Sequence, residues 1–252
     1  MDIFVQLGNL SVATRIEGNG APLVLLHGWG GKRDSWLPVI RHYAENYTVY
    51  VLDFPGFGQT PEPPHTWDVT DYAALVDEWL EALGVRGAYV IGHSFGGRVA
   101  ILLAARYPHR VAKLVLTDAA GLIPKRSFRY YVKVYTYKIG KVLSRLLGLP
   151  IEKLMKKAGS PDYQQLSQGM RKIFTRVVNQ DLSGYLPDIQ APTLLIYGRE
   201  DKETPVAFGE YMEKHIPDAG LVVLENAGHF AYLDQFPSFC KIVNVFLKED
   251  EA

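Results

Sequence analysis

The sequence of 252 residues contains a single cysteine, Cys240. One cysteine cannot form an intramolecular disulfide or a cysteine-based metal cluster, and we interpret Cys240 as a small core residue. No apolar run approaches the ~20 residues that a membrane-spanning helix requires, and residues 1–10 lack the basic and apolar regions of a secretory signal. The expectation is therefore a cytoplasmic protein without stable membrane insertion.

An excess of charge of either sign is also missing. Lys and Arg together number 27, as do Asp and Glu, so the formal net charge is +0. This balance identifies no partner, and no nucleic-acid-binding motif is present. Hydrophobic residues make up 48% of the chain, which is enough to bury one sizeable core, and α/β domains of this length are commonly single units.

Short apolar runs alternate with helical patterns along most of the chain. Residues 3–7 and 11–18, joined by Gly-Asn, predict an antiparallel hairpin at the edge of a sheet. Buried parallel strands are predicted at 22–28, 47–56, 88–94, 113–121, 193–197 and 220–226. Helices are predicted at 35–46, 68–84, 96–108, 207–215 and 236–248. The pattern predicts an α/β fold with a mostly parallel sheet of about eight strands and helices on both faces.

The alternation breaks after Gly121 and resumes in the last quarter of the chain. Residues 122–185 have helical character and no clear strand. We therefore expect a helical cap at 122–185, inserted into an α/β core formed by 1–121 and 186–252.

The pentapeptide GHSFG lies at the end of the predicted strand 88–94. Gly92 and Gly96 flank Ser94, and a helical pattern begins directly afterwards. Such a strand-to-helix turn holds the serine in strained backbone geometry at the carboxyl edge of the sheet, and small flanking residues let the two segments approach closely. Because a serine alcohol is a weak nucleophile at neutral pH, it needs a base within reach and a third group that orients the base.

This stretch, with HGWGG before it and GRED and NAGHF after it, resembles the α/β-hydrolase fold family. The likeness covers nearly the whole chain except the predicted cap. It implies an α/β-hydrolase fold in which the partners of Ser94 follow it in the order acid, then histidine.

His229 is the predicted base, because it follows the strand 220–226 and so lies at the same edge of the sheet as Ser94. His27 and His93 belong to the motifs, and we interpret them as bracing their loops through hydrogen bonds. The other histidines are interpreted as surface or loop residues: His42, His65, His109 and His215.

Two aspartates compete for the role of the acid. Asp201 follows the strand 193–197, and the acid of the family resembles it in position and in its GxxD setting. Asp118 also ends a strand, and some members of the family use that site. We favour Asp201 and interpret Asp118 as bracing a loop or lining the pocket.

The transition state of acyl transfer carries a negative charge on the carbonyl oxygen, which two backbone N–H groups have to stabilise. The Phe95 amide, directly after the nucleophile, is the first predicted donor. HGWGG looks like the HGx loop of the family, and this resemblance implies that the Trp29 amide is the second donor. The glycines of this loop permit a close backbone approach. The loop contains neither GxGxxG nor GxxxxGK[ST], so nucleotide binding is not indicated.

Within the predicted cap, residues 125–157 carry ten basic residues against one acid, Glu152. They are interleaved with apolar residues, which predicts an amphipathic basic helix. One interpretation is a cap helix with its apolar side over the active site and its lysines in water. The alternative hypothesis is a basic face that attracts an anionic substrate or a lipid surface.

The leading interpretation is a serine hydrolase that cleaves small-molecule carboxylic esters through an acyl-enzyme, with Ser94, His229 and Asp201 as catalytic residues and no cofactor or metal. The resemblance leaves other functions open: a carbon–carbon bond hydrolase of ring-cleavage diketones, a lactonase, a haloperoxidase-like enzyme, an acyltransferase or a ligand receptor. Dehalogenases and epoxide hydrolases of this fold carry an acid where Ser94 stands, so the sequence departs from both.

Overall fold

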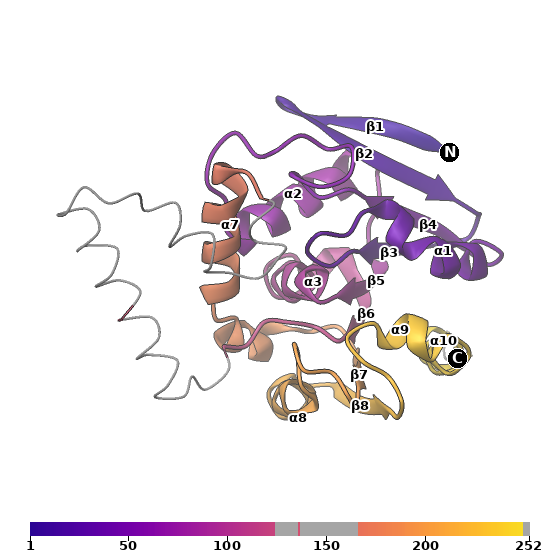
Figure 1. Cartoon of the computed structure of the whole chain (residues 1–252). Coiled ribbons are helices and arrows are strands. Elements are labelled where there is room, and N and C mark those ends of the chain that lie inside the picture. The colour runs from indigo at the N-terminus through magenta and orange to yellow at the C-terminus, as the bar shows by residue number, and fades with distance from the viewer. Residues whose placement is uncertain (124–135, 137–165, 249–252) are drawn as a thin grey trace.

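One eight-stranded sheet organises the chain in the computed structural model, which describes residues 1–123, 136 and 166–248 (Figure 1). The strand order is β1-β2-β4-β3-β5-β6-β7-β8. Pairs β1–β2 and β2–β4 are antiparallel, and the remaining pairs are parallel. The strands are β1 Asp2–Leu7, β2 Leu10–Glu17, β3 Ala21–Leu26, β4 Tyr47–Leu52, β5 Ala88–His93, β6 Val111–Thr117, β7 Thr193–Gly198 and β8 Ala219–Leu224.

Helices cover both faces of this sheet (Figure 1). The α-helices are α1 Leu37–Tyr43, α2 Val69–Ala82, α3 Phe95–Arg106, α7 Gln168–Asn179, α8 Val206–His215, α9 Ala231–Asp234 and α10 Phe236–Leu247. Short 3-10 helices occur at η1 Arg33–Trp36, η2 Pro108–Arg110 and η3 Ser183–Asp188. None of the helices within residues 1–123 and 166–248 combines the length and the apolar character needed to cross a lipid bilayer.

The apolar runs form strands because side chains on both faces of the sheet are buried. In β3, Val24 and Leu26 belong to the core under α2 and α3, whereas Leu23 and Leu25 belong to the core under α1 and α10. Successive residues of a strand point to opposite faces, so a strand covered on both sides is apolar throughout. The predicted fold class, including the antiparallel edge hairpin, is confirmed.

Local signals set the ends of α2. The Asp68 carboxylate accepts a hydrogen bond from Thr70 N at 2.7 Å, and the Asp71 carboxylate accepts one from Asp68 N at 2.7 Å. This reciprocal pair satisfies two N–H groups that lack a partner inside the helix. Gly84 follows the helix with φ +67°, a conformation that glycine adopts without strain.

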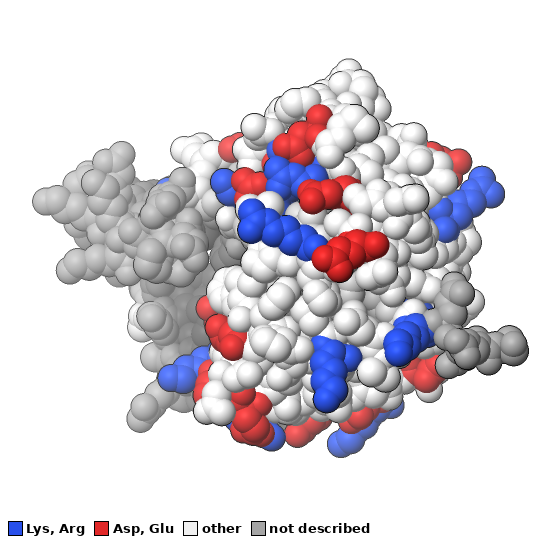
Figure 2. Space-filling model, turned by 90° about the vertical axis from the view of Figure 1, so that its right-hand side faces the viewer, with Lys and Arg blue, Asp and Glu red and all other residues white. Residues whose placement is uncertain are grey.

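The cap at 122–185 remains a prediction. Of this range the structure describes residues 122–123, 136 and 166–185, which include α7 and the start of η3, and α7 packs Met170, Ile173 and Val177 against the core shared with α2 and α3. The basic segment 125–157 lies outside the described residues, except for Thr136. Figure 2 shows the side of the molecule that carries α1 and α10, where Lys and Arg are intermixed with Asp and Glu.

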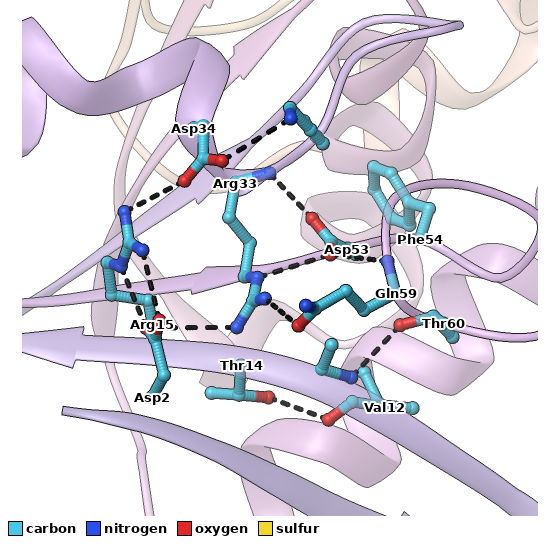
Figure 3. Close-up of polar contacts among 12 residues, drawn as sticks. Asp2, Val12, Thr14, Arg15, Arg33, Asp34, Asp53, Phe54, Gln59 and Thr60 are labelled. Carbon is cyan, nitrogen blue, oxygen red and sulfur yellow. Dashed lines mark hydrogen bonds and ion pairs between the residues drawn. The ribbon is translucent and has the colours of Figure 1, made fainter.

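A buried ion pair joins the loops after β3 and β4. Asp53 accepts from Arg33 N at 2.6 Å, from Arg33 Nε at 3.2 Å and from Gln59 N at 2.9 Å (Figure 3). The Arg33 and Asp53 side chains are only 8% and 2% exposed. A Cβ atom at Gly58 would overlap the Asp53 carboxylate, so the chain passes close to this ion pair. The pair therefore holds two neighbouring loops at one end of the sheet.

We expect Arg33→Ala to lower the free energy of unfolding by about 3 kcal/mol, because it leaves the Asp53 charge buried without its cation. Arg15→Ala is the matched control. Arg15 pairs with Asp2 and Asp34, whose side chains are 53% and 44% exposed, so its removal should cost less than about 1 kcal/mol. Urea unfolding at neutral pH measures both, and equal losses would contradict the role given to the buried pair.

Candidate active site

Ser94 occupies a sharp turn between β5 and α3. Its φ and ψ are 51° and −110°, a conformation that is strained for any residue with a side chain. Ser94 N donates to Thr117 O at 3.3 Å. A Cβ atom at Gly96 would overlap the carbonyl oxygen of Leu26, and one at Gly92 would lie 2.7 Å from Gly96 O. Both glycines of the pentapeptide are therefore required by the close approach of β5, α3 and β3.

The structure brings His229 and Asp201 to Ser94. His229 Nε2 lies 3.0 Å from Ser94 Oγ, and His229 Nδ1 lies 2.8 Å from Asp201 Oδ2. Since an ionised carboxylate only accepts hydrogen bonds, Nδ1 carries the proton and Nε2 presents its lone pair to the serine hydroxyl. The three residues follow β5, β7 and β8, so they lie at one edge of the sheet.

Asp201 is held by its own loop as well as by His229. Its Oδ1 accepts from Glu203 N at 2.7 Å and from Thr204 N at 3.1 Å, and its Oδ2 lies 2.6 Å from Thr204 Oγ1. Burial raises the pKa of the Asp201 carboxyl, but the hydrogen bonds from His229 and Thr204 outweigh burial and lower it. Asp201 is therefore ionised at neutral pH.

The pKa of His229 is raised. Burial lowers it, but the hydrogen bond to Asp201 and the negative charges of Asp201 and Glu203 together raise it above its ordinary value. Glu203 Oε2 lies 3.4 Å from His229 Nε2, although the Glu203 side chain is 74% exposed. A protonated His229 would thus be stabilised from both ring nitrogens, which suits a group that takes up and returns a proton.

Asp118 occupies a different position from Asp201. Its Oδ1 accepts from Gly198 N at 2.8 Å and its Oδ2 from Ala231 N at 2.9 Å, while the structure places Asp201 at His229 Nδ1. Asp118 is fully buried, and burial raises its pKa to about 7 against the lowering effect of the two N–H donors. Asp118 therefore braces the end of β7 and the segment just after His229.

Trp29 and Phe95 line the same cavity as Ser94, and their backbone amides have no acceptors of their own among the described residues. Phe95 N is the first N–H of α3, and in the described part of the chain neither N–H donates to a protein acceptor. The Trp29 ring packs edge-on against Phe57, Phe95 and Phe174, with ring centroids 4.8, 5.3 and 5.1 Å away. These contacts fix the loop that carries the Trp29 amide.

Two further histidines support the loops. His27 Nε2 accepts from Phe54 N at 3.0 Å, and its Nδ1 donates to Gly28 O at 2.8 Å. His93 Nε2 donates to the backbone oxygen of His229 at 2.7 Å. Burial lowers the pKa of His27 to about 4 and that of His93 to about 3, so both rings are neutral. They hold the backbone on either side of Ser94 without carrying charge.

A cavity of about 710 Å³ opens at Ser94. Its lining includes residues that the sequence patterns did not single out, namely Arg98, Phe174, Val177, Val178, Glu203 and Thr204. Glu203 and Thr204 lie within three positions of Asp201 in the sequence, and this proximity could have identified them as residues of the site. Phe174, Val177 and Val178 belong to α7, and only the tertiary packing of this helix brings them to the site. No group of three or more metal-ligating His, Cys, Asp or Glu side chains converges among the described residues.

Comparison with known families gives two matches. Residues 21–135 match the family described as the alpha/beta hydrolase fold, and residues 175–252 match the family described as TAP-like protein. The first match contains Trp29, Ser94 and Asp118, and the second contains Asp201 and His229. The five residues thus fall within matched parts of the chain.

Individual proteins are similar over nearly the full length. A pimeloyl-[acyl-carrier protein] methyl ester esterase of Legionella pneumophila is 30% identical over 244 residues, covering 92% of this chain and 97% of the relative. The crystal structure of a membrane phospholipase A is 28% identical with a TM-score of 0.75, covering 98% and 85% of the two chains. An esterase from Exiguobacterium antarcticum, 23% identical, has a TM-score of 0.79 with coverage of 99% and 100%, a likeness of fold.

The arrangement predicts distinct titrations for the three histidines of the site. We expect the pKa of His229 to lie above the ordinary value of a histidine, so that its neutral, proton-accepting form is lost as the pH falls through that raised pKa. His27 and His93 stay neutral down to pH values near 4 and 3. Long-range ¹H–¹⁵N NMR spectra of the imidazole groups, recorded against pH, measure all three.

Substitutions assign the cause of the raised pKa. Asp201→Asn and Glu203→Gln should each lower the pKa of His229, because each removes a negative charge that favours the protonated ring. Glu225→Gln removes an exposed carboxylate that pairs with Arg199, and it should leave the titration of His229 unchanged. A wild-type His229 pKa below the ordinary value of a histidine, or one insensitive to Asp201→Asn, would contradict the described geometry.

Proposed function

Since the chain belongs to the α/β hydrolase fold family, we propose that it is a serine hydrolase that cleaves carboxylic esters through an acyl-enzyme intermediate. The observation that carries the proposal is the hydrogen-bonded series Asp201–His229–Ser94, with distances of 2.8 and 3.0 Å. The relatives of this chain at about 30% identity are carboxylic ester hydrolases, and this similarity supports the same reaction class.

Acylation begins at Ser94. As Ser94 Oγ attacks the ester carbonyl carbon, its proton passes to His229 Nε2, and the carbonyl π electrons move to the oxygen. The N–H groups of Trp29 and Phe95 donate to this oxyanion, and they need not leave another protein acceptor to do so. The imidazolium forms between Asp201 and Glu203, whose negative charges stabilise it.

Collapse of the tetrahedral intermediate releases the alcohol. The bond between carbonyl carbon and alcohol oxygen breaks, and His229 Nε2 returns its proton to that oxygen. A water molecule then attacks the acyl carbon while His229 Nε2 takes its proton. The bond between the acyl carbon and Ser94 Oγ breaks, His229 returns the proton to Ser94 Oγ, and the carboxylic acid is released. Asp201 remains ionised throughout, because its lowered pKa keeps it a hydrogen-bond acceptor for Nδ1.

The cavity supports an ester with an apolar portion. Trp29, Phe174, Val177 and Val178 line it beside Ser94, and apolar walls bind hydrocarbon chains by the hydrophobic effect. The backbone N–H groups, the serine hydroxyl and the imidazole supply the chemistry, so no cofactor enters the proposed reaction.

We expect the wild-type protein to hydrolyse p-nitrophenyl esters in a chain-length series, and Ser94→Ala to abolish this activity. Asp201→Asn should lower kcat by about 10⁴-fold, since the amide holds His229 in the wrong tautomer. Asp118→Asn should cost far less in kcat, because Asp118 contacts backbone N–H groups rather than the imidazole. Steady-state kinetics with matched thermal unfolding separates chemistry from loss of fold.

A ring-cleavage diketone serves as the comparison substrate. Turnover of the diketone with no turnover of any ester would overturn the ester assignment in favour of carbon–carbon bond hydrolysis. Hydrolysis that stops after about one equivalent would argue for a ligand receptor. Full ester hydrolysis by Ser94→Ala would contradict the proposed nucleophile.

A further inference from the structure

Arg98 is a buried cation beside the proposed nucleophile. It lies one helical turn after Ser94 in α3, where Arg98 N donates to Ser94 O at 3.2 Å. The residue is 6% exposed, and it lines the same cavity as Ser94. A long cationic side chain is therefore enclosed next to the reacting centre, and the proposed mechanism does not use it.

The other buried arginines of the described residues have carboxylate partners. Arg33 Nε lies 3.2 Å from Asp53 Oδ2, and Arg110 Nε lies 2.6 Å from Asp77 Oδ1. Arg98, in contrast, has no carboxylate within ion-pair distance in the part of the chain that the structure describes. The Arg98 side chain donates a hydrogen bond from Nη1 to Gln180 O, at 2.8 Å. Arg98 is thus the buried guanidinium without a directly paired carboxylate there, and Asp181, next to Gln180 in the sequence, acts on its charge from beyond ion-pair distance.

Burial without a counterion is unfavourable for a charged group. Burial lowers the pKa of Arg98 to about 10 against the raising effect of the Asp181 charge, which still leaves the guanidinium charged at neutral pH. A guanidinium has five N–H donors, and Gln180 O uses one nitrogen. Among the described residues, the side-chain polar atoms that are both fully buried and without a hydrogen-bond partner belong to Trp29, Trp36 and Tyr43. No atom of Arg98 is among them. The free N–H groups of Arg98 therefore remain reachable from the cavity.

The position of Glu203 fixes which part of an ester would lie near Arg98. His229 Nε2 must reach the alcohol oxygen to protonate it, and Glu203 lies 3.4 Å from this nitrogen. The alcohol portion therefore lies on the Glu203 side, where a second negative charge would be repelled. Arg98 instead bonds to Gln180 at the end of α7, next to the lining residues Val177 and Val178. The acyl chain is left to extend toward Arg98.

We propose that Arg98 binds a carboxylate at the far end of the acyl chain, so that the preferred substrates are monoesters of dicarboxylic acids. The proposal rests on the ester hydrolysis proposed above and names its substrate class. A planar carboxylate accepts two parallel N–H bonds from a guanidinium, and such a bidentate pair inside a cavity is strong and directional. The bond to Gln180 O keeps the guanidinium in place for this contact.

The experiment compares the monomethyl esters of straight-chain dicarboxylic acids with the corresponding ω-carboxamide methyl esters. The readout is the ratio of kcat/KM for carboxylate over carboxamide, measured for each chain length. We expect the wild type to favour the carboxylate by about 100-fold at the best length, and Arg98→Gln to remove that preference. Arg98→Lys should keep part of it, because the charge remains but the fork geometry is lost.

Arg106→Gln is the matched control on the same helix. Arg106 is exposed and donates to Tyr185 OH at 3.0 Å, so its substitution removes an equal charge away from the cavity. We expect Arg106→Gln to retain the wild-type ratio. The ratio distinguishes binding from structural support, because a damaged fold lowers both kcat/KM values together and leaves their quotient intact.

Two results would overturn the proposal. They are a wild-type ratio near one at every length and an unchanged ratio in Arg98→Gln. In both cases ester hydrolysis dependent on Ser94 would still stand. If the wild type cleaves no ester at all, calorimetry with Ser94→Ala decides: dicarboxylate binding that Arg98→Gln removes supports the carboxylate site, and absence of binding overturns it.

Discussion

The parallel alignment of β5, β6, β7 and β8 is the constraint on which the site depends. His93 pairs with Thr117, Thr117 with Ile196, and Gly198 with Leu224, so the four strands end close together. Asp118, directly after β6, ties the neighbouring ends by accepting from Gly198 N and Ala231 N. The loops carrying Ser94, Asp201 and His229 thereby start from fixed positions, and short hydrogen bonds between them become possible.

Sequence periodicity was sufficient to predict the eight strands and the longer helices that cover the sheet, whereas the four-residue helix α9 was not predicted. Strands buried on both faces are continuously apolar, and the residues that end them are small or polar, so each element carried its own local signal. The proximity of Ser94 to His229 and Asp201 was expected from the resemblance and from the rule that parallel strands end at one edge. The sequence favoured Asp201 over Asp118 although both follow strands, and the contacts of the two carboxylates, Asp201 with His229 and Asp118 with backbone N–H groups, are visible only in the folded structure.

The part of the site built by tertiary packing left no such signal. Phe174 and Val177 form part of an amphipathic pattern in α7 that is the same whether the helix faces a core or a cavity. Arg98 stands in an otherwise apolar helix directly after the serine motif, but the sequence does not reveal whether a carboxylate neutralises it. Pairing of buried charges is decided by side chains far apart in sequence, such as Arg33 with Asp53, and only the folded arrangement identifies an unpaired one.

In the proposed mechanism His229 makes Ser94 a nucleophile. Reaction with a fluorophosphonate at neutral pH, followed by peptide mass spectrometry, tests this role directly, because such reagents form a stable adduct with an activated serine. We expect one adduct, on Ser94, in the wild-type protein and none at the same exposure in His229→Ala. An adduct on another residue, or undiminished labelling of Ser94 without the imidazole, would contradict the claim.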